Sequence, residues 1–419
     1  LSLGLVGSEM CIRDSIACIY MACNIGANDV ANAMGTSVGS KSLTFKQAIL
    51  IAAVAEFAGA FFVGGHVSDT IRKGMLDTSF FADVPYQLVY GMISALLAAA
   101  IWLHIASYLG WPVSTTHSII GGVLGFGVIA GGVDIVNWSK VGNVVLSWVV
   151  SPIMGGLFAY LVFQYINKTI FSKRRPLAHA KELLPFIVAI VFFILSIAIF
   201  YKGLKNLHLH FTFPDVLFFA LVAGVVGFFI SKILVRFIPD DDSKDFAHQF
   251  NTTENLFKYL QIVTAFYIAF AHGSNDVANA VGPLAAVVSI LQGGAVEMKV
   301  EMPTWILGLG GGFIVLGLMV WGYRVMATVG ESITDITPSR GFCATFGAAS
   351  VVLICSKMGL PISTTHTLVG SVIGVGLARG LPTLNLGIIK MIFISWVTTI
   401  PFTAVISMLF FKLFLVFLT

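Results

Sequence analysis

The sequence predicts an all-α polytopic membrane protein that contains two homologous repeats, and three observations support this prediction. The chain of 419 residues is 57% hydrophobic and only 11% charged, which lies far outside the composition of soluble globular proteins. Apolar runs of about 20 residues, long enough to cross a ~30 Å hydrocarbon core, recur along the chain. A polar motif of ten residues occurs once in each half. We therefore expect a multi-pass protein of the cell (plasma or inner) membrane, surrounded by lipid bilayer.

Charge and cysteine content exclude several other classes of protein. The net charge of +4 is small, and no basic stripe interleaved with aromatic residues follows the chain, so we expect no nucleic-acid partner. The five cysteines are odd in number and contain no Cys-x-x-Cys pair. Neither a disulfide framework nor a zinc site is therefore expected.

The chain divides into four parts. The first fifteen residues do not continue the hydrophobic pattern that begins at Ile16, and we interpret residues 1–15 as foreign, vector-like sequence that takes no part in the fold. Residues 16–167 form the first transmembrane repeat, and residues 258–419 form the second. Residues 168–257 connect them through a basic loop, two plain transmembrane helices and a charged loop. The basic loop contains Lys173-Arg174-Arg175 and is predicted to be cytoplasmic by the positive-inside rule.

Within the first repeat, each element follows from its hydrophobic pattern. The first span carries the polar motif, whose glycines and asparagines predict an interrupted helix of the kind tolerated where it lines a cavity. A later stretch, 118–132, is rich in glycine and hydroxyl groups and is interpreted as a re-entrant hairpin. The predicted full spans are 16–38, 45–65, 87–109 and 141–166.

The second repeat follows the same order as the first. The two Asn-Asp motifs are 247 residues apart, and later glycines of the two halves match at a separation of 258 residues. Internal duplication of this kind is typical of secondary transporters that bind their cargo between the repeats. The number of full crossings decides whether the copies are parallel or inverted, and the sequence leaves this open. The remaining predicted spans are 183–201, 216–235, 259–284, 305–323, 342–358 and 386–417.

The repeated polar motif predicts a cation site. Residues 26–35 and 273–282 are identical at eight of ten positions, and a lone ionised side chain inside a membrane helix costs ~3 kcal/mol even on a lenient scale. Carboxylate and amide oxygens, with carbonyls freed at a helix break, suit a sodium ion. The alternative is hydrogen bonding between helices, which does not require a carboxylate. The candidate ligands are Asn28, Asp29, Asn32, Asn275, Asp276 and Asn279, with Na⁺ at Asp29 and Asp276.

A second repeated motif predicts an anion site. The segments 112–117 and 361–366 read Pro-x-Ser-Thr-Thr-His before a helix-like run. This pattern is typical of a helix N-terminus, where proline fits the first turn, hydroxyls cap, and free N–H groups attract an anion. The alternative is that the hydroxyl groups bond back to their own helix. The candidate phosphate-binding residues are Ser114, Thr115, Thr116, Ser363, Thr364 and Thr365.

Three further titratable residues are candidates for coupling. His117 and His366 follow the hydroxyl triplets and could relay a proton, orient a hydroxyl group or act only as caps, because histidine titrates near neutral pH. Glu56 is a single acid within a predicted span. The sequence does not distinguish sodium coupling from proton coupling.

These motifs, together with Thr328-Val329-Gly330-Glu331 and residues 338–342, closely resemble the inorganic phosphate transporter (PiT) family of sodium- or proton-coupled phosphate symporters. The resemblance covers nearly everything from about residue 20 onward. It implies an inverted-repeat, alternating-access transporter that forms homodimers, with cations held at Asp29 and Asp276 and phosphate at the hydroxyl triplets. It implies no cofactor besides Na⁺ as the coupling ion. Coupling to H⁺, transport of a metal-phosphate complex, or a related sulfate permease are the alternatives.

Two other functional classes compete with a carrier. An intramembrane hydrolase could use Ser114 or Ser363 with the following histidine, but a catalytic site rarely needs two symmetric copies and no nucleophile-turn pattern is present. We therefore do not expect an enzyme. A passive channel is the other alternative, and it would show no accumulation of cargo against a gradient.

Overall fold

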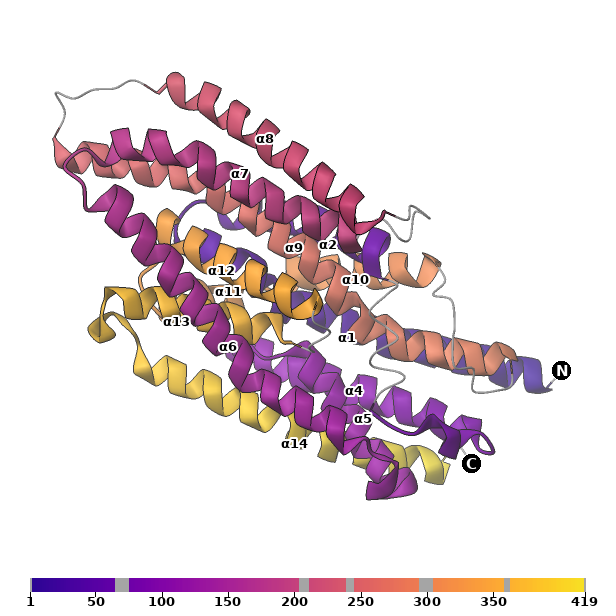
Figure 1. The fold of residues 1–419 in the computed structure, drawn as a ribbon. Coiled ribbons are helices and arrows are strands. Elements are labelled where there is room, and N and C mark those ends of the chain that lie inside the picture. The colour runs from indigo at the N-terminus through magenta and orange to yellow at the C-terminus, as the bar shows by residue number, and fades with distance from the viewer. Residues whose placement is uncertain are drawn as a thin grey trace.

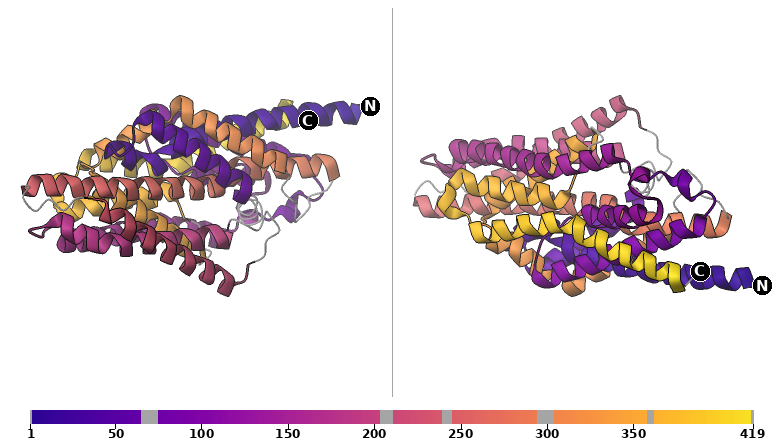
Figure 2. Two further views of the ribbon diagram at one scale, coloured as in Figure 1. Left: turned by 90° about the horizontal axis from the view of Figure 1, so that it is seen from above. Right: turned by 90° about the horizontal axis from the view of Figure 1, so that it is seen from below.

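The computed structural model describes residues 2–64, 75–202, 211–238, 245–293, 304–357 and 362–417, and these are almost entirely helical. The helices run side by side in an elongated body, and both chain termini lie at the same end (Figures 1 and 2). Helices α7 and α8 pack against each other along one flank, at the top of Figure 1, whereas α14 lies on the opposite side.

Each predicted span corresponds to a helix. The first half contains α1 (Ser2–Gly39), α2 (Phe45–Val63), η2 (Thr78–Phe81), α4 (Pro85–Leu109), α5 (Thr115–Gly131), η3 (Val133–Ile135) and α6 (Trp138–Ile166). The connection contains η4 (Asn167–Phe171), α7 (Pro176–Lys202) and α8 (Phe213–Arg236). The second half contains α9 (Phe246–Gly293), α10 (Thr304–Trp321), α11 (Tyr323–Ala327), η6 (Thr328–Ser332), α12 (Pro338–Lys357), α13 (Thr364–Arg379), η7 (Leu381–Thr383) and α14 (Leu386–Phe417).

The lengths and compositions of these helices make the chain a multi-pass integral membrane protein. Within the described residues, eight helices are long and apolar enough to cross a bilayer, and α1 and α9, which carry the polar motifs, are not among them. Helices such as α8 and α14 expose many large apolar side chains, as a lipid-facing surface requires. The two motif helices pack against one another and against several other helices, and their motif side chains are buried.

The predicted interruption of the first motif helix is wrong. Helix α1 runs through its motif without a break, and so does α9. The motif glycines permit close helix packing instead: a Cβ atom at Gly26 would overlap the carbonyl group of Ile314, and one at Gly273 would overlap that of Glu56. Because glycine has no side chain, these helices approach backbone to backbone. No carbonyl groups are therefore freed within the motifs to act as cation ligands.

Interior helix breaks occur instead in two hairpins. Helices α4 and α5 form the first, and its open end is closed by a bridge between Leu76 and Val136 and by a 2.8 Å bond from the Asp77 N–H to the Ile135 carbonyl. The tip turns at Gly110, whose φ of 73° suits glycine. The re-entrant hairpin predicted around 118–132 thus includes α4, and 87–109 is one arm of it rather than a separate crossing.

The second hairpin has the same construction. Helices α12 and α13 are joined at their open end by a bridge between Thr334 and Leu384 and by a 3.0 Å bond from the Asn385 N–H to the Ile333 carbonyl. Residues 358–361 of the connection lie outside the described residues. Because each hairpin begins and ends at the same end of the molecule, neither reverses the direction of the helices that follow.

The two motif helices run in opposite directions. Asp29 of α1 faces His272 of α9, whereas Thr36, further along α1, accepts a 2.9 Å hydrogen bond from the earlier residue Gln261 of α9. Each motif helix packs in parallel with the second helix of the other half, α1 with α10 and α9 with α2. The hairpin helices are exchanged in the same way, since α5 packs on α14 and α13 packs on α6.

The basic segment marks one end of the molecule. Gln164, near the end of α6, donates a 3.3 Å hydrogen bond to the carbonyl of Ala378 at the end of α13. Lys173-Arg174-Arg175 follows α6 and therefore lies at this end, which the positive-inside rule predicts to be cytoplasmic. Part of the predicted charged loop before residue 258 is instead helical, because α9 begins at Phe246 and the carboxylate of Asp245 accepts a 3.1 Å bond from the His248 N–H.

Candidate functional site

The centre of the site is a buried histidine surrounded by three carboxylates. His272 of α9 places Nε2 3.2 Å from Oδ2 of Asp29 and 2.9 Å from Oδ2 of Asp276, one turn further along its own helix. On the other side of the ring, Nδ1 lies 3.5 Å from Oε1 of Glu56 on α2. All four side chains are buried. Three helices therefore bring their ionisable groups to one point inside the protein.

The first motif contacts the hydroxyl triplet of the opposite half. Asn32 donates from Nδ2 to Oδ1 of Asp29 at 3.0 Å and to Oγ1 of Thr365 at 2.8 Å. The Thr365 hydroxyl lies 3.3 Å from the same Asp29 oxygen. Since Thr365 lies in the first turn of α13, the aspartate of one repeat is held against the helix N-terminus of the other.

The second motif repeats this arrangement with the first triplet. Asn279 donates from Nδ2 to Oδ1 of Asp276 at 2.9 Å and to the hydroxyl oxygens of Thr115 and Thr116, each at 3.2 Å. The Thr115 hydroxyl lies 3.4 Å from Oδ1 of Asp276. The residues predicted from the two separate motifs, for cation and for anion, thus lie directly beside one another.

The hydroxyl triplets lie at helix N-termini, as their pattern predicts. Ser114 is the N-cap of α5 and its hydroxyl accepts from the N–H of His117 at 3.3 Å; Ser363 caps α13 and accepts from His366 at 3.2 Å. Pro112 precedes the N-cap rather than lying in the first turn, and Pro361 lies outside the described residues. The first two N–H groups of each helix have no intrahelical acceptor, which suits them to bind an anion. Thr364 is the first residue of α13 and is partly exposed.

The donor set at the centre fits a cation. In the described structure Oδ1 of Asn32 has no hydrogen-bond partner, and Oδ2 of Asp29 and Oδ2 of Asp276 accept no hydrogen bond besides their contact with Nε2 of His272. One ligand atom each from Asp29, His272 and Asp276 lie within 4.8 Å of one another. Burying several carboxylates around one imidazole is costly, and carboxylate and amide oxygens are the ligands that hard cations prefer. These residues can therefore hold a metal ion.

The other two predicted amide ligands lie apart from this centre. Asn28 fixes the tip of the first hairpin: its Oδ1 accepts from the Val113 N–H at 3.1 Å, and its Nδ2 donates to the Trp111 carbonyl at 3.0 Å. Asn275 donates to the carbonyl of Ala271 at 2.9 Å on its own helix. The geometry of Asn28 indicates a residue that positions the hairpin beside the site.

The two histidines of the triplets lie next to each other. The rings of His117 and His366 are 4.8 Å apart, and His366 stacks on Trp396 at 3.7 Å between centroids. Both are buried, and neither ring nitrogen of His366 has a hydrogen-bond partner in the described structure. Their contacts are aromatic rather than with the central carboxylates.

Sequence reasoning missed His272, the residue that joins the carboxylates. It precedes the second motif directly, and the equivalent position in the first half, 247 residues earlier, is Ile25. Glu56 likewise corresponds to Ile314, at the separation of 258 residues. The signal that could have identified His272 and Glu56 is that each is ionisable where the other repeat has an isoleucine.

Comparison with known proteins identifies the family. Residues 25–407 match the family model described as the phosphate transporter family. The chain belongs to the phosphate transporter family. A putative phosphate permease of Pyrococcus horikoshii is 49% identical over 94% of this chain and 95% of its own length. A chloroplastic inorganic phosphate transporter of Arabidopsis thaliana is 44% identical over 93% of this chain and 70% of its own length.

A solved structure confirms the fold of this phosphate transporter. The structure described as the sodium-dependent phosphate transporter has a TM-score of 0.87 and 42% sequence identity, and covers 98% of this chain and 100% of its own. The chain is therefore a phosphate transporter and not an enzyme. The predicted resemblance to the family is confirmed.

Proposed function

We propose that the protein is a symporter that carries inorganic phosphate together with sodium ions by alternating access. One observation carries this proposal: each motif aspartate lies against a threonine hydroxyl at the helix N-terminus of the opposite repeat, at 3.3 Å for Asp29 and 3.4 Å for Asp276. A cation at the carboxylates and an anion at the N–H groups would thus be immediate neighbours. The sodium dependence in the description of the similar solved structure favours Na⁺ over H⁺.

Electrostatics would couple the two cargoes. Three carboxylates repel an anion that enters the interior of the protein. The repulsion is strong because the low-dielectric interior screens charges much less than water does. Sodium ions at Asp29 and Asp276 would remove this repulsion and attract phosphate to the N-termini of α5 and α13. Each ligand would therefore raise the affinity for the other, and only the loaded or the empty carrier would close readily. No arginine is needed at the centre, so the anion remains releasable.

Opposite halves of the site would move relative to each other during transport. The hydroxyl triplets belong to the hairpins, whereas the aspartates belong to the long motif helices. Ligands that bridge a hairpin to a motif helix favour the conformation in which the two are in contact. The homodimer that the family resemblance implies is part of this proposal, and light scattering of the detergent-solubilised protein tests it.

A metal-phosphate complex is a second candidate cargo, and one observation favours it. Nε2 of His272 lies between the two aspartates, and imidazole nitrogen is a ligand for transition metals rather than for sodium. Contact of the other ring nitrogen with Glu56 resembles the carboxylate that orients many metal-bound histidines. Under this alternative a divalent metal and phosphate would be carried together.

Uptake of labelled phosphate into liposomes that contain the purified protein tests both candidates. We expect an imposed sodium gradient to drive accumulation in metal-free buffer, with Asp29→Asn as the inactive control. Accumulation driven only by a pH gradient would contradict sodium coupling. Uptake that requires a divalent metal, with co-accumulation of that metal, would establish the second candidate. Competition by sulfate equal to that by unlabelled phosphate would contradict phosphate as the specific cargo.

A further inference from the structure

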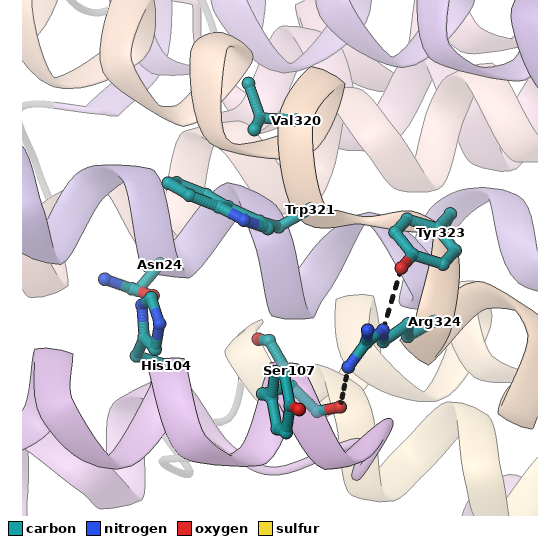
Figure 3. A pocket seen from close by; sticks show the side chains of 8 residues that line it. Asn24, His104, Ser107, Val320, Trp321, Tyr323 and Arg324 are labelled. Atoms are coloured by element: carbon teal, nitrogen blue, oxygen red, sulfur yellow. Dashed lines mark hydrogen bonds between the residues drawn. The ribbon is translucent and has the colours of Figure 1, made fainter.

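A cavity beside the first motif helix is not part of the site described above. It has a volume of about 340 Å³ and lies between α4 and the α10–α11 corner, where both pack on α1 (Figure 3). By the volume of liquid water it has room for roughly ten water molecules, and hence for a hydrated oxyanion. The polar side chains that line it are Asn24, His104, Ser107, Tyr108, Tyr323 and Arg324.

Arg324 is the cationic group of this cavity, and aromatic contacts fix its position. Its Nε donates to the Tyr323 hydroxyl at 2.8 Å and its Nη1 donates to the Tyr108 carbonyl at 2.7 Å. The guanidinium carbon lies 4.5 Å from the centre of the Tyr108 ring. Figure 3 shows the guanidinium group between Tyr323 and the end of α4, on the side of Ser107. Neither tyrosine group neutralises its charge.

The charge of Arg324 is unmatched. No carboxylate lines the cavity, and among the described residues no acidic side chain forms an ion pair with Arg324. Its Nη2 group makes no hydrogen bond within the same residues, so the fork geometry of the guanidinium keeps donors available. By contrast, Arg340 and Arg379 at the open end of the second hairpin both pair with Asp335.

The cavity connects to the central site through two residues. Ser107 lines it, and its hydroxyl accepts a 3.2 Å hydrogen bond from Nδ2 of Asn28. Asn28 in turn holds the tip of the first hairpin through Val113 and adjoins Asp29 in the chain. An anion in the cavity would thus contact α4, an arm of the same hairpin that carries Thr115.

Within the described residues, the equivalent place in the other half is smaller. A small cavity lies there, at Tyr267, Ala271 and Leu353, with a volume of only about 20 Å³ and no charged side chain in its lining. Asn24 and His104 correspond by the repeat to Ala271 and Leu353.

We propose that this cavity is a second oxyanion-binding subsite, in which Arg324 binds phosphate outside the central site. The proposal extends the proposed function, since it takes inorganic phosphate as the ligand. Because Arg324 provides the positive charge, binding at this subsite requires no sodium, whereas binding at the central carboxylates does. The same chemistry would also accept the phosphate group of a lipid from the surrounding bilayer, so both sources are tested.

Equilibrium binding of radiolabelled phosphate to the purified protein tests the subsite. In choline buffer without sodium, we expect weak binding to the wild-type protein that falls at least about tenfold in Arg324→Gln and weakens with added salt, because the arginine is partly exposed. Arg324→Lys should bind less well than wild type but better than Arg324→Gln, since lysine retains the charge and lacks the planar fork. Arg236→Gln, an exposed arginine at the end of α8, serves as the matched control and should not differ from wild type.

Separate outcomes distinguish the subsite from the central site. Asp29→Asn should lose sodium-dependent binding and keep the sodium-independent component. Two results together would overturn the proposal. The first is that the wild type shows no sodium-independent phosphate binding, in detergent or in phosphatidylcholine nanodiscs. The second is that Arg324→Gln has no effect on binding of phosphatidylglycerol. If phosphatidylglycerol nanodiscs abolish phosphate binding in the wild type and Arg324→Gln no longer binds that lipid, the subsite stands and the lipid is its occupant. A wild-type protein that binds phosphate here but shows no sodium-driven uptake would contradict the proposed function and leave the subsite intact.

Discussion

The two halves of the central site share one part and differ in another. Asp29 with Asn32 and Asp276 with Asn279 have matching geometries, each against a threonine of the opposite repeat. Behind the aspartates the halves diverge. Behind Asp276 lies the buried ionisable pair of His272 on α9 and Glu56 on α2, whereas the matching positions behind Asp29 are the buried apolar residues Ile25 on α1 and Ile314 on α10.

This difference shows that the protein contains one centre rather than two independent sites. Nε2 of His272 lies within 3.2 Å of both aspartates, so a single imidazole joins the two matching parts. A second histidine at position 25 would place two imidazoles against the same carboxylates. The duplicated aspartates and asparagines each contact one hairpin. His272 has no counterpart in the other repeat, and it contacts both aspartates at the single centre.

The largest expected effect comes from the shared part. Asp29→Asn and Asp276→Asn should each reduce sodium-dependent phosphate uptake by on the order of 100-fold or more, because removal of one buried charge from a matched group costs about 3–5 kcal/mol. Initial uptake rates in proteoliposomes, normalised to the amount of folded protein, provide the measurement. Equal losses in both variants would support the symmetry. Wild-type uptake by either variant would show that only one half binds the cation.

The next effect concerns the pair that the halves do not share. His272→Ile should lower the free energy of unfolding by about 3–5 kcal/mol, because Glu56 and both aspartates would remain buried without the imidazole that they contact. The double variant His272→Ile with Glu56→Ile converts this half to the apolar arrangement of the other. Replacement of a buried ion pair by apolar residues of similar size is often neutral or stabilising, so the double variant should regain the stability lost at Glu56, whereas Asp29 and Asp276 still lack the imidazole.

Thermal unfolding followed by intrinsic fluorescence measures this recovery. Glu56→Ile alone is the third corner of the double-mutant cycle. A double variant as unstable as the sum of the two single variants would mean that the residues do not interact. If the double variant is stable but inactive, the pair is required for transport and not for folding.

The smallest expected effect comes from the threonines. Thr115→Val and Thr365→Val each remove one hydroxyl beside an aspartate, and we expect the apparent phosphate affinity to fall roughly tenfold in each, since a hydrogen bond to a charged group contributes about 1.5–3 kcal/mol. Thr364→Val is the matched control and should have a smaller effect. It removes a hydroxyl for which no contact with either aspartate is found in the described structure. Phosphate dependence of uptake at saturating sodium measures all three. Equal effects of Thr364→Val and Thr365→Val would contradict the assigned register of α13.

Local patterns predicted much of this protein correctly. Apolar runs located the membrane helices because hydrophobicity over about 20 residues is a property of the segment itself. The hydroxyl residues of each Ser-Thr-Thr segment were predicted to cap a helix, and Ser114 and Ser363 are N-caps, because capping depends on residues within one turn. The candidate ligands Asp29 and Asp276 do meet at one centre.

Predictions that depended on distant contacts were less successful. The motif helix was expected to break at its glycines, but Gly26 and Gly273 lie against the backbones of neighbouring helices, and the helix continues. Asn28 was predicted as a cation ligand, yet its amide is committed to the hairpin tip. His272 was overlooked because a lone histidine beside a motif has no local signature.

By itself, the sequence determined the membrane helices, the duplication, the two polar motifs and the helix caps, since each depends on residues close together in the chain. Only the tertiary structure decided that the motif helices run antiparallel, that each motif meets the triplet of the opposite repeat, and that His272 joins Asp29 to Asp276. The physical reason is that these contacts join residues more than 150 positions away from each other in the chain, with the exception of the one-turn contact of His272 with Asp276. The register of such contacts is set by the packing of one helix against another.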